Sequence, residues 1–400
     1  MKKLYLSCVR RSFWTFFLLV AWIIFGGVGA ASYAADKVIK IGASPDLSGP
    51  TAEVGKPFAT GLRAHLDYVN KMGGIKGQRI EYLETDGSYS IPKETGAYKR
   101  FAMDGVVAFV GYSGGGQMQI SQMCTQDKIV SFGASIAEVF ADPEKAPYYF
   151  IHCASYDQVW RALIDYEIAK HPGKKPRTAL VFPDNPYGHQ NADMIRLHLK
   201  KRGLEIMDEE IVGFKDIDAT TQMLKMKRST PDAVFCPQVE PSIAVIMRDA
   251  KKVGIDTKKT RFYVPLQGMG PVGLKLGGSD VEDLMGGSPF SDWQEKDLPG
   301  IKIIREVNAG KEAVLPWYMH GWAAAAVICE GIRMLGDKQI TGENLKAALE
   351  SIKNFGNGNI TSPISYSTKN HVGGRGVKIY RASLKDMAFQ PISDFVYPEQ

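Results

Sequence analysis

Apolar and polar positions follow two different periods along this chain, and both appear near its start. Residues 38–41 alternate apolar and polar, which is typical of a strand. Residues 46–55 are a stretch of Ser, Gly, Pro and Thr that is too polar to be buried without partners. Apolar residues then recur at helical spacing over residues 58–69, with Pro57 suited to the first turn and Gly73 to the end. The pattern predicts a βα unit whose loop lies beyond the carboxyl end of a strand, where open α/β sheets bind ligands.

Strand-like and helix-like segments alternate through the rest of the chain, which predicts parallel sheets flanked by helices. The expected strands are residues 79–85, 106–110, 129–132, 148–151, 178–182, 205–210, 233–236 and 261–264. The expected helices are residues 89–103, 191–202, 219–228, 241–253, 317–335 and 342–351. The roughly 365 residues beyond the first 34 exceed what one core usually serves, so two α/β lobes are expected.

The first 34 residues have the composition of a signal peptide. Four Lys and Arg residues form a basic head, residues 13–25 are an apolar run, and the segment ending at Ala34 resembles a cleavage site. An uncleaved anchor is the alternative, because residues 13–31 are almost long enough to span a membrane. The glycines and other small residues after the apolar run favour cleavage near Ala34, so the mature protein is expected to be exported.

Charge and cysteine content narrow the classes of function. The chain has 49 basic and 43 acidic residues, and the leader contributes four of the basic ones and none of the acidic ones. The mature chain is therefore nearly neutral and gives no support for nucleic-acid binding. Its cysteines show no C-x-x-C pair and no metal-ligand spacing, and both buried free thiols and a disulfide remain open. These cysteines are Cys124, Cys153, Cys236 and Cys329.

The opening stretch resembles the start of the mature solute-binding proteins of ABC importers, in particular the leucine/isoleucine/valine-binding family. The residues that carry the match are Ile41, Gly42, Leu47, Ser48, Gly49, Pro50, Ala52, Gly55, Gly61, Asn70, Gly73, Gly74, Ile75 and Gly77. Further matches run along almost the whole mature chain. The resemblance implies the type I periplasmic-binding fold, with two Rossmann-like α/β lobes joined by three crossovers. The implied N-terminal lobe is residues 36–153 plus 291–358, the C-terminal lobe is residues 157–287 plus 360–400, and the crossovers lie near residues 153–157, 286–293 and 358–365.

Residues 111–116 follow an expected strand and open a helix. Backbone N–H groups at such a start, together with the Ser113 hydroxyl, suit an anion because they are free donors at the positive end of a helix dipole. In the family this loop holds the ligand carboxylate. The next loop, residues 131–135, matches a segment in which the family uses a hydroxyl for the same ligand head, and Ser135 takes that position.

Two sequence motifs suggest other chemistry. Residues 111–115 fit G-x-S-x-G, the nucleophile elbow of hydrolases, with His320 and His371 downstream. No HGGG-type oxyanion loop precedes the motif, so a secreted serine hydrolase using Ser113 is an alternative with little support. Residues 268–273 match the dinucleotide pattern G-x-G-x-x-G but contain a proline, and we interpret them as a turn-rich loop.

Aromatic residues are expected at the ligand from three further segments. Residues 184–188 resemble the family's Tyr-Gly loop, in which Tyr187 would reach over the ligand, although a plain βα turn is the alternative. Tyr156 lies at the expected first crossover, beside both lobes. Trp322 belongs to an aromatic group at a helix start that lies near the cleft in the family. His152 is interpreted as a hydrogen-bonded structural residue.

Departures from the family bear on the identity of the ligand. Its amino-acid binders place an acidic residue, which pairs with the ligand ammonium, where this chain has Gln267. Val54 and Val239 stand where those binders have aromatic residues. A buried ammonium without an anion is costly, although Glu240 could compensate and Gln238 offers a neutral amide. We expect a small carboxylate or amide with an apolar or aromatic body and no required α-amino group, or alternatively a branched-chain or hydrophobic amino acid.

The sequence thus predicts a periplasmic substrate-binding protein of an ABC importer that captures a small solute by hinge closure and is not an enzyme. It is expected to work as a monomer with permease subunits in the inner membrane, without cofactor, metal or nucleic acid. A ligand sensor for a membrane receptor has the same fold and is an alternative. The expected ligand-binding residues are Ser48, Val54, Tyr112, Ser113, Gly114, Gly133, Ala134, Ser135, Tyr156, Tyr187, Gln238, Val239, Gln267 and Trp322.

Overall fold

The computed structural model describes residues 38–309 and 315–399 of the chain. The expected signal peptide, with its cleavage site near Ala34, lies outside these residues. Within them, no helix is both long and apolar enough to cross a membrane. The described residues from Ile39 onward form one compact unit, and their strands make two β-sheets.

The first sheet has four parallel strands in the order β2-β1-β3-β4. The strands are β1 (Ile39–Ala43), β2 (Ile80–Glu84), β3 (Ala108–Gly111) and β4 (Val130–Gly133), and the connecting helices are α2 (Ala52–Lys71), α3 (Ile91–Met103) and α4 (Gly114–Asp127). The register places Ile41 of β1 between Tyr82 of β2 and Ala108 of β3. Because β2 and β3 lie on opposite sides of β1, the topological switch point falls between the carboxyl ends of β1 and β3, where α/β folds bind ligands.

The second sheet has seven strands in the order β11-β10-β9-β8-β7-β5-β6. Its parallel strands are β5 (Thr178–Phe182), β6 (Ile206–Ile211), β7 (Ala233–Phe235), β8 (Arg261–Pro265) and β9 (Met285–Ser288). The strands β10 (Lys378–Ser383) and β11 (Ala388–Pro391) extend it in antiparallel order. The helices of this part are α5 (Tyr156–Ala169), α6 (Pro186–Lys201), α7 (Thr220–Ser229), α8 (Glu240–Lys252) and α9 (Pro271–Gly277).

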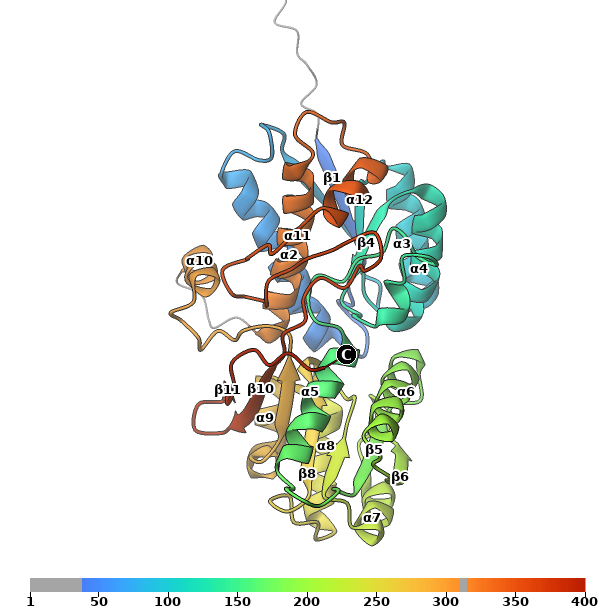
Figure 1. Ribbon diagram of the computed structural model, residues 1–400, viewed down its shortest axis with the longest axis vertical. Helices are drawn as coiled ribbons and strands as arrows, with labels where there is room; N and C mark the ends of the chain where they lie inside the picture. The colour runs from blue at the N-terminus through green and yellow to red at the C-terminus, as the bar shows by residue number, and fades with distance from the viewer. Residues whose placement is uncertain (1–37, 310–314, 400) are drawn as a thin grey trace, which may run out of the picture. The chain divides into compact units, whose positions relative to one another are not determined.

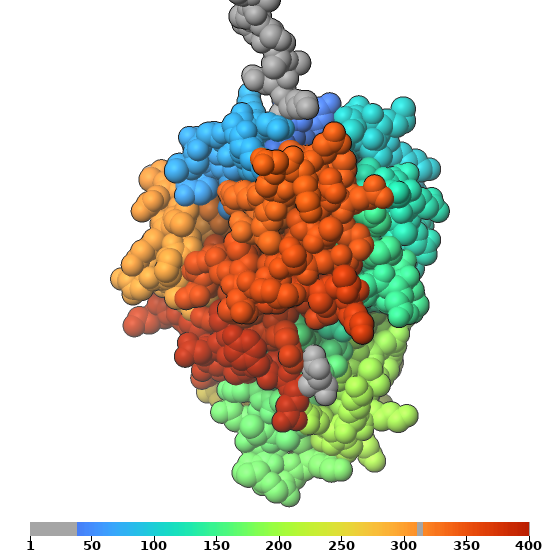
Figure 2. All heavy atoms as spheres, turned by 45° about the horizontal axis from the view of Figure 1, so that its top comes forward, coloured from blue at the N-terminus to red at the C-terminus, as the bar shows by residue number. Residues whose placement is uncertain are grey.

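Three helices from the last part of the chain complete the structure. They are α10 (Pro299–Val307), α11 (Pro316–Met334) and α12 (Gly342–Glu350), and short 3₁₀ helices occur as η1 (Glu138–Phe140), η2 (Leu266–Gly268) and η3 (Gly278–Val281). Helix α11 packs against α2, and α12 packs near β4 (Figure 1). Figure 2 shows the orange residues of this late segment on one face beside the blue N-terminal residues. Segments far apart in the sequence therefore enclose the first sheet.

Glycines set the distance between α2 and α11, which make the most extensive helix contact among the described elements. A Cβ atom added to Gly321 of α11 would lie 2.0 Å from the carbonyl oxygen of Phe58 in α2. A Cβ atom added to Gly61 of α2 would likewise lie 2.0 Å from the carbonyl oxygen of Tyr318 in α11. The two helices thus meet backbone to backbone, and neither position has room for a side chain.

Most of the expected elements are present, and the differences have local causes. The strand expected over residues 148–151 forms only isolated bridges, which pair Tyr149 with Ser131 and Ile151 with Val372. The prediction failed because a buried apolar run has the same composition whether or not it pairs along its length. The four cysteines after the leader are all buried and free, so the disulfide alternative is not realised.

Two further differences lie in the second sheet. Helix α6 begins at Pro186 rather than at residue 191, because Asn185 caps it and proline suits the first turn. The strands β9, β10 and β11 were not expected. The sequence of β9 is MGGS, which has low strand propensity, but its Gly287 allows a close approach to Leu163 of α5, which lies 3.0 Å from where a Cβ atom would be.

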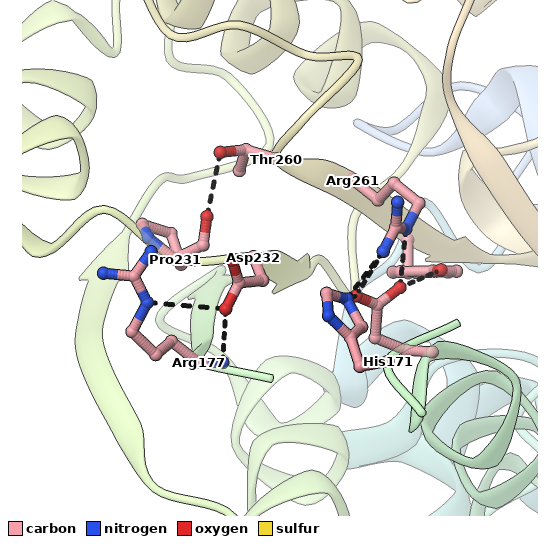
Figure 3. A network of polar contacts seen from close by, with 8 residues as sticks. His171, Arg177, Pro231, Asp232, Thr260 and Arg261 are labelled. Carbon is pink, nitrogen blue, oxygen red and sulfur yellow. Dashed lines mark hydrogen bonds and ion pairs between the residues drawn. The ribbon is translucent and has the colours of Figure 1, made fainter. Parts of the chain in front are cut away.

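A buried ion pair ties α5 to the second sheet. Glu167 of α5 accepts hydrogen bonds from Arg261 Nε at 2.7 Å, from an Arg261 terminal nitrogen at 2.8 Å, and from the Tyr263 hydroxyl at 2.6 Å. His171 Nε2 lies 2.7 Å from the same carboxylate (Figure 3). Because the Glu167 side chain is only 1% exposed, its charge depends on these partners.

We expect Glu167→Gln to lower the free energy of unfolding by about 3 kcal/mol, because the Arg261 cation then loses its counter-charge. The measurement is urea denaturation followed by circular dichroism. Asp232→Asn is the matched control, since it removes the charge that pairs with the half-exposed Arg177 in Figure 3 and should cost less than about 1 kcal/mol. Equal losses in the two variants would contradict this account.

Candidate ligand-binding site

One cavity receives residues from the loops that follow each strand from β1 to β8. Its lining residues are Thr51 and Val54 after β1, Tyr89 after β2, Tyr112, Ser113 and Gly114 after β3, Ala134 and Ser135 after β4, Tyr156 at the start of α5, Tyr187 after β5, Phe214 after β6, Val239 after β7, Gln267 after β8, and Trp317 at the start of α11. The centre of a water-sized sphere can occupy about 40 Å³ there. That is room for roughly three waters, so a larger ligand requires the walls to move.

Helix caps hold two of the lining loops in place. Ser113 caps α4, and its Oγ accepts a hydrogen bond from the Gly116 N–H at 3.0 Å. Asn185 caps α6 in the same way, with its Oδ1 accepting from the Gly188 N–H at 2.9 Å. These side chains satisfy N–H groups that have no partner inside the helices. The caps thereby fix Ser113 and the neighbouring Tyr187 at the cavity from two different sheets.

Aromatic rings from both sheets meet around the cavity. The ring of Phe214 lies 6.0 Å from that of Tyr89 and 6.0 Å from that of Tyr187. The Tyr187 ring also lies 5.7 Å from that of Tyr156, and the Tyr89 ring lies 6.2 Å from that of Tyr112. These centroid distances are typical of favourable edge-to-face and tilted pairs. The wall suits an apolar or aromatic ligand body, whose burial would supply most of the binding free energy.

Four polar atoms at the cavity have no hydrogen-bond partner among the described residues. They are Ser135 Oγ, Tyr187 Oη, Gln267 Oε1 and Trp317 Nε1. A buried polar group without a partner is costly, so these atoms favour a ligand that carries polar groups of its own. The lining residues include no Asp, Glu, Lys or Arg, so recognition here relies on neutral donors and acceptors.

The structure brings ten of the fourteen expected residues into this one cavity. They are Val54, Tyr112, Ser113, Gly114, Ala134, Ser135, Tyr156, Tyr187, Val239 and Gln267. Ser48 and Gln238 are not among the lining residues; each side chain donates a hydrogen bond elsewhere, and Gln238 Oε1 has no partner among the described residues. The Ser48 hydroxyl donates to the Asp86 carboxylate, and Gln238 Nε2 donates to the carbonyl oxygen of Val212 at 2.9 Å.

Gly133 and Trp322 are the other two expected residues that do not line the cavity. Gly133 ends β4, where an added Cβ atom would lie 2.1 Å from Gln117 Nε2. The Trp322 ring instead packs against α2, with its centroid 4.7 Å from that of His65. The role of Gly133 is thus close packing beneath the loop, and that of Trp322 is contact between helices.

Four lining residues were not anticipated as ligand contacts. They are Thr51, Tyr89, Phe214 and Trp317. Thr51 lies in the polar opening loop. Because that loop follows β1, its position could have indicated Thr51 as a ligand contact. Tyr89 and Phe214 are aromatic residues in loops that follow expected strands, so the same rule could have found them. Trp317 belongs to the aromatic group in which Trp322 was chosen instead.

Glu94 of α3 occupies part of the helix start that was expected to hold a ligand carboxylate. Its Oε2 accepts hydrogen bonds from the Ser113 N–H at 3.0 Å and from the Tyr112 N–H at 3.3 Å. Burial raises the pKa of Glu94 to about 7, while these hydrogen bonds act in the opposite direction. The loop still reaches the cavity through Gly114, so a ligand would share this region with a carboxyl group of the protein.

We expect Glu94→Gln to remove a pH dependence of stability between about pH 4.5 and 7. The folded-state pKa lies above the ordinary value, so the folded protein holds its proton where the unfolded chain has lost it. Stability from this group is therefore complete below that range and is lost as the pH rises, by roughly 3 kcal/mol in total. Urea denaturation at several pH values should show a shallower decline in the variant. Exposed Glu53→Gln is the control, and identical slopes in wild type and Glu94→Gln would contradict the prediction.

Glu240, which was considered as a substitute anion for a ligand ammonium, does not line the cavity. Its Oε2 accepts a hydrogen bond from the Gly273 N–H at 2.9 Å at the start of α9, and burial raises its pKa to about 7. The cavity is reached instead by Gln267, whose Nε2 donates to the Tyr156 hydroxyl at 2.5 Å. A ligand ammonium would need a carboxylate as its partner. The described lining of the cavity offers the Gln267 amide instead.

The surroundings of Ser113 do not favour the hydrolase alternative. A nucleophilic serine needs a base within hydrogen-bond reach. His371 is engaged by the Tyr149 carbonyl and by Glu350, and His320 is packed between aromatic rings. Among the described residues, no histidine is hydrogen-bonded to Ser113, whose Oγ serves as a helix cap.

Comparisons with known proteins give a consistent picture. A family model described as "Periplasmic binding protein" matches residues 38–387. The chain is 24% identical to the leucine-, isoleucine-, valine-, threonine-, and alanine-binding protein of Pseudomonas aeruginosa, over 82% of this chain and 87% of that protein. It is 22% identical to the Leu/Ile/Val-binding protein of Citrobacter freundii, over 84% of this chain and 89% of that protein.

Solved structures share the fold at low sequence identity. A branched chain amino acid ABC transporter protein from Thermus thermophilus with bound valine matches with a TM-score of 0.82 and 24% identity, over 90% of this chain and 97% of that chain. A fatty acid ABC transporter substrate-binding protein from Thermomonospora curvata matches with a TM-score of 0.82 and 20% identity, over 91% and 93%. The α/β architecture is therefore shared by proteins whose named ligands differ.

Proposed function

Because this chain belongs to the periplasmic binding protein family, we propose that it is the substrate-binding component of an ABC importer, which captures a small solute without transforming it. Its α/β fold is the type I periplasmic-binding fold that the sequence predicted. The observation that carries the proposal is the cavity to which the loops after all the strands from β1 to β8 contribute. Such a cavity closes around a ligand from two sheets at once, which is suited to capture.

We propose that the two sheets belong to two lobes that close by a hinge movement. The N-terminal lobe would be residues 36–153 plus 291–358, and the C-terminal lobe would be residues 157–287 plus 360–400. In support, the strands of the first sheet all precede residue 134, and β5 to β11 fall within the ranges of the second lobe except for Ser288, the last residue of β9. Because the cavity has so little free space, opening of the lobes would admit the ligand and closure would bury it.

The proposed ligand is a small carboxylate or amide with an apolar or aromatic body, for which an α-amino group is not required. Three features of the cavity support this class: its aromatic wall, its neutral polar atoms without partners, and Gln267 in place of an acid. The named ligands of the relatives and structural neighbours range from branched-chain amino acids to a fatty acid, so proteins of this fold accommodate acids without an ammonium group. A hydrophobic amino acid is the alternative within the same site.

We further propose that the protein is exported to the periplasm after cleavage near Ala34. There it would act as a monomer and deliver its ligand to permease subunits in the inner membrane. The family membership and the composition of the first 34 residues support this location.

A thermal-shift screen tests the proposed function directly. The purified protein is heated with amino acids, aromatic acids, short aliphatic acids and amides, each at several concentrations. A true ligand raises the melting temperature with concentration, and at 100 times its Kd it adds about 2.7 kcal/mol of stability. We expect the response from acids or amides that lack an ammonium group. Tight binding of leucine or valine with no response to aromatic acids would contradict the proposed ligand class, and no response from any compound would contradict the function.

A further inference from the structure

Two histidines and one cysteine meet in the core behind the ligand cavity. The side-chain ligand atoms of His152, Cys153 and His320 all lie within 4.8 Å of one another, and all three residues are fully buried. His152 and Cys153 stand between the bridge residue Ile151 and the start of α5, and His320 lies in α11, one turn after the cavity residue Trp317. Two imidazoles and one thiol, which are ligand types that bind copper and zinc, are thus placed together by segments far apart in the sequence.

The imidazole nitrogens of this cluster have no partners in the described structure. Neither ring nitrogen of His152 or of His320 makes a hydrogen bond, although both rings are completely buried. Cys153 is a free thiol. Buried polar groups are almost always satisfied, so two histidines without any hydrogen bond require an explanation. We propose that His152, Cys153 and His320 bind a single Cu(I) ion.

The walls of the site favour a monovalent ion over a divalent one. The ring of His320 lies 4.8 Å from that of Phe290, 5.1 Å from that of Phe58 and 5.7 Å from that of Trp317. The ring of His152 lies 6.1 Å from that of Phe132. No acidic side chain of the described residues is hydrogen-bonded to the cluster. One Cu(I) and one thiolate cancel in charge, whereas Zn(II) with one thiolate leaves a net positive charge among aromatic rings, which is costly.

The separations between the three ligand atoms are close to those in a three-coordinate metal site. With metal–ligand bonds of about 2.0 to 2.3 Å, three ligand atoms in a trigonal arrangement lie roughly 3.6 Å apart. The present separations require a side-chain movement of only about 1 Å to reach this. The backbone carbonyls of His320 and Gly133 lie near the rings of His152 and His320, respectively. They could accept the second N–H of each ring once the first nitrogen binds the metal.

Binding is a ligation without redox change. The Cys153 S–H bond breaks, its proton passes to solvent, and the sulfur lone pair forms the bond to copper. Each imidazole binds in its neutral form through one nitrogen. The product is a neutral complex, which fits a cluster to which no charged side chain of the described residues is hydrogen-bonded. Spacing along the chain did not predict a metal site, because His320 is distant in sequence from the adjacent pair.

Anaerobic titration of the reduced protein with Cu(I), in competition with the chelator bicinchoninate, tests the proposal. Because the site is buried, the metal is supplied both to the folded protein and during refolding from urea. We expect one Cu(I) per chain with thiolate-to-copper absorption in the ultraviolet. Cys153→Ser should weaken binding at least about 100-fold. Cys124→Ser and Cys329→Ser are matched controls, since they alter equally buried thiols outside the cluster and should bind as the wild type does.

X-ray absorption at the copper edge provides a test that needs no variant. We expect one sulfur and two nitrogen neighbours in the loaded wild-type protein. Failure to take up Cu(I) by either route would overturn the proposal, as would full binding by Cys153→Ser. A copper environment without sulfur, or Zn(II) bound as tightly as Cu(I), would overturn it as well.

Discussion

Replacing Gly321 with alanine is expected to lower the free energy of unfolding by at least about 4 kcal/mol, beyond the 1–3 kcal/mol usual for an overpacked core. The added Cβ atom would lie 2.0 Å from the carbonyl oxygen of Phe58 and 2.8 Å from the backbone nitrogen of Leu62. Both are backbone atoms of α2, so no side-chain rotation relieves the overlap. The helices must separate, and the apolar contacts along their whole interface weaken together.

Two other glycines make this prediction specific. Gly61→Ala introduces the reciprocal overlap from α2, with the Tyr318 carbonyl oxygen 2.0 Å away, and should be similarly damaging. Gly96→Ala is the matched control, because Gly96 is exposed within α3 and a Cβ atom there has no neighbour within 4 Å. Alanine is the better helix former, so that variant should be unchanged or up to about 1 kcal/mol more stable. Urea denaturation gives the free energy of unfolding of the three variants. A Gly321→Ala variant as stable as Gly96→Ala would contradict the close packing of α2 and α11.

The first βα unit could be predicted from sequence because all its signals are local. The alternation of residues 38–41, the polar loop and the helical spacing that begins near Phe58 each depend on neighbours along the chain. The resemblance to the solute-binding family then supplied most of the expected cavity residues, and they lie beyond strand ends as the general rule for α/β sheets requires. Tyr187 and Gln267 follow β5 and β8 and line the cavity as this rule requires.

The prediction of Trp322 rather than Trp317 as a ligand contact shows what local sequence patterns cannot determine. The two residues lie roughly 140° apart around α11, so only one of them can face the cavity. Their spacing cannot show which, because the rotation of α11 is set by its contact with α2. The glycine at position 321 packs that face of α11 against Phe58, and Trp322 follows it into the helix interface.

Polar residues raised a different difficulty. Ser48 was expected at the ligand because it belongs to the polar opening loop that matches the family, and Gln238 because it offers a neutral amide. In the structure the partner of Ser48 is Asp86, and that of Gln238 is the Val212 carbonyl. These pairings join different βα loops, and sequence separation carries no information about them. The same is true of Glu94, which was not anticipated at the start of α4.

Gln267→Glu is expected to reverse the preference between an acid and its α-amino counterpart. Gln267 lines the cavity and its side chain is buried; Nε2 donates to Tyr156, and Oε1 has no partner among the described residues. A glutamate there places a carboxylate among aromatic rings, where it repels a ligand carboxylate and attracts a ligand ammonium. A close buried ion pair contributes about 3 kcal/mol, so the ratio of the two dissociation constants should change by about 100-fold.

The ligands for this experiment are the acid that gives the largest thermal shift in the screen and the same acid with an α-amino group. Isothermal titration calorimetry of wild type, Gln267→Glu and Gln267→Met gives the affinities. Gln267→Met is the control, because it removes the amide without adding charge and should lose affinity for both ligands without reversing their order. The wild type should bind the plain acid more tightly, since the cavity has no carboxylate to compensate a buried ammonium. A wild type that prefers the amino acid, or an unchanged ratio in Gln267→Glu, would show that another group recognises the ammonium and that Gln267 does not determine the cargo.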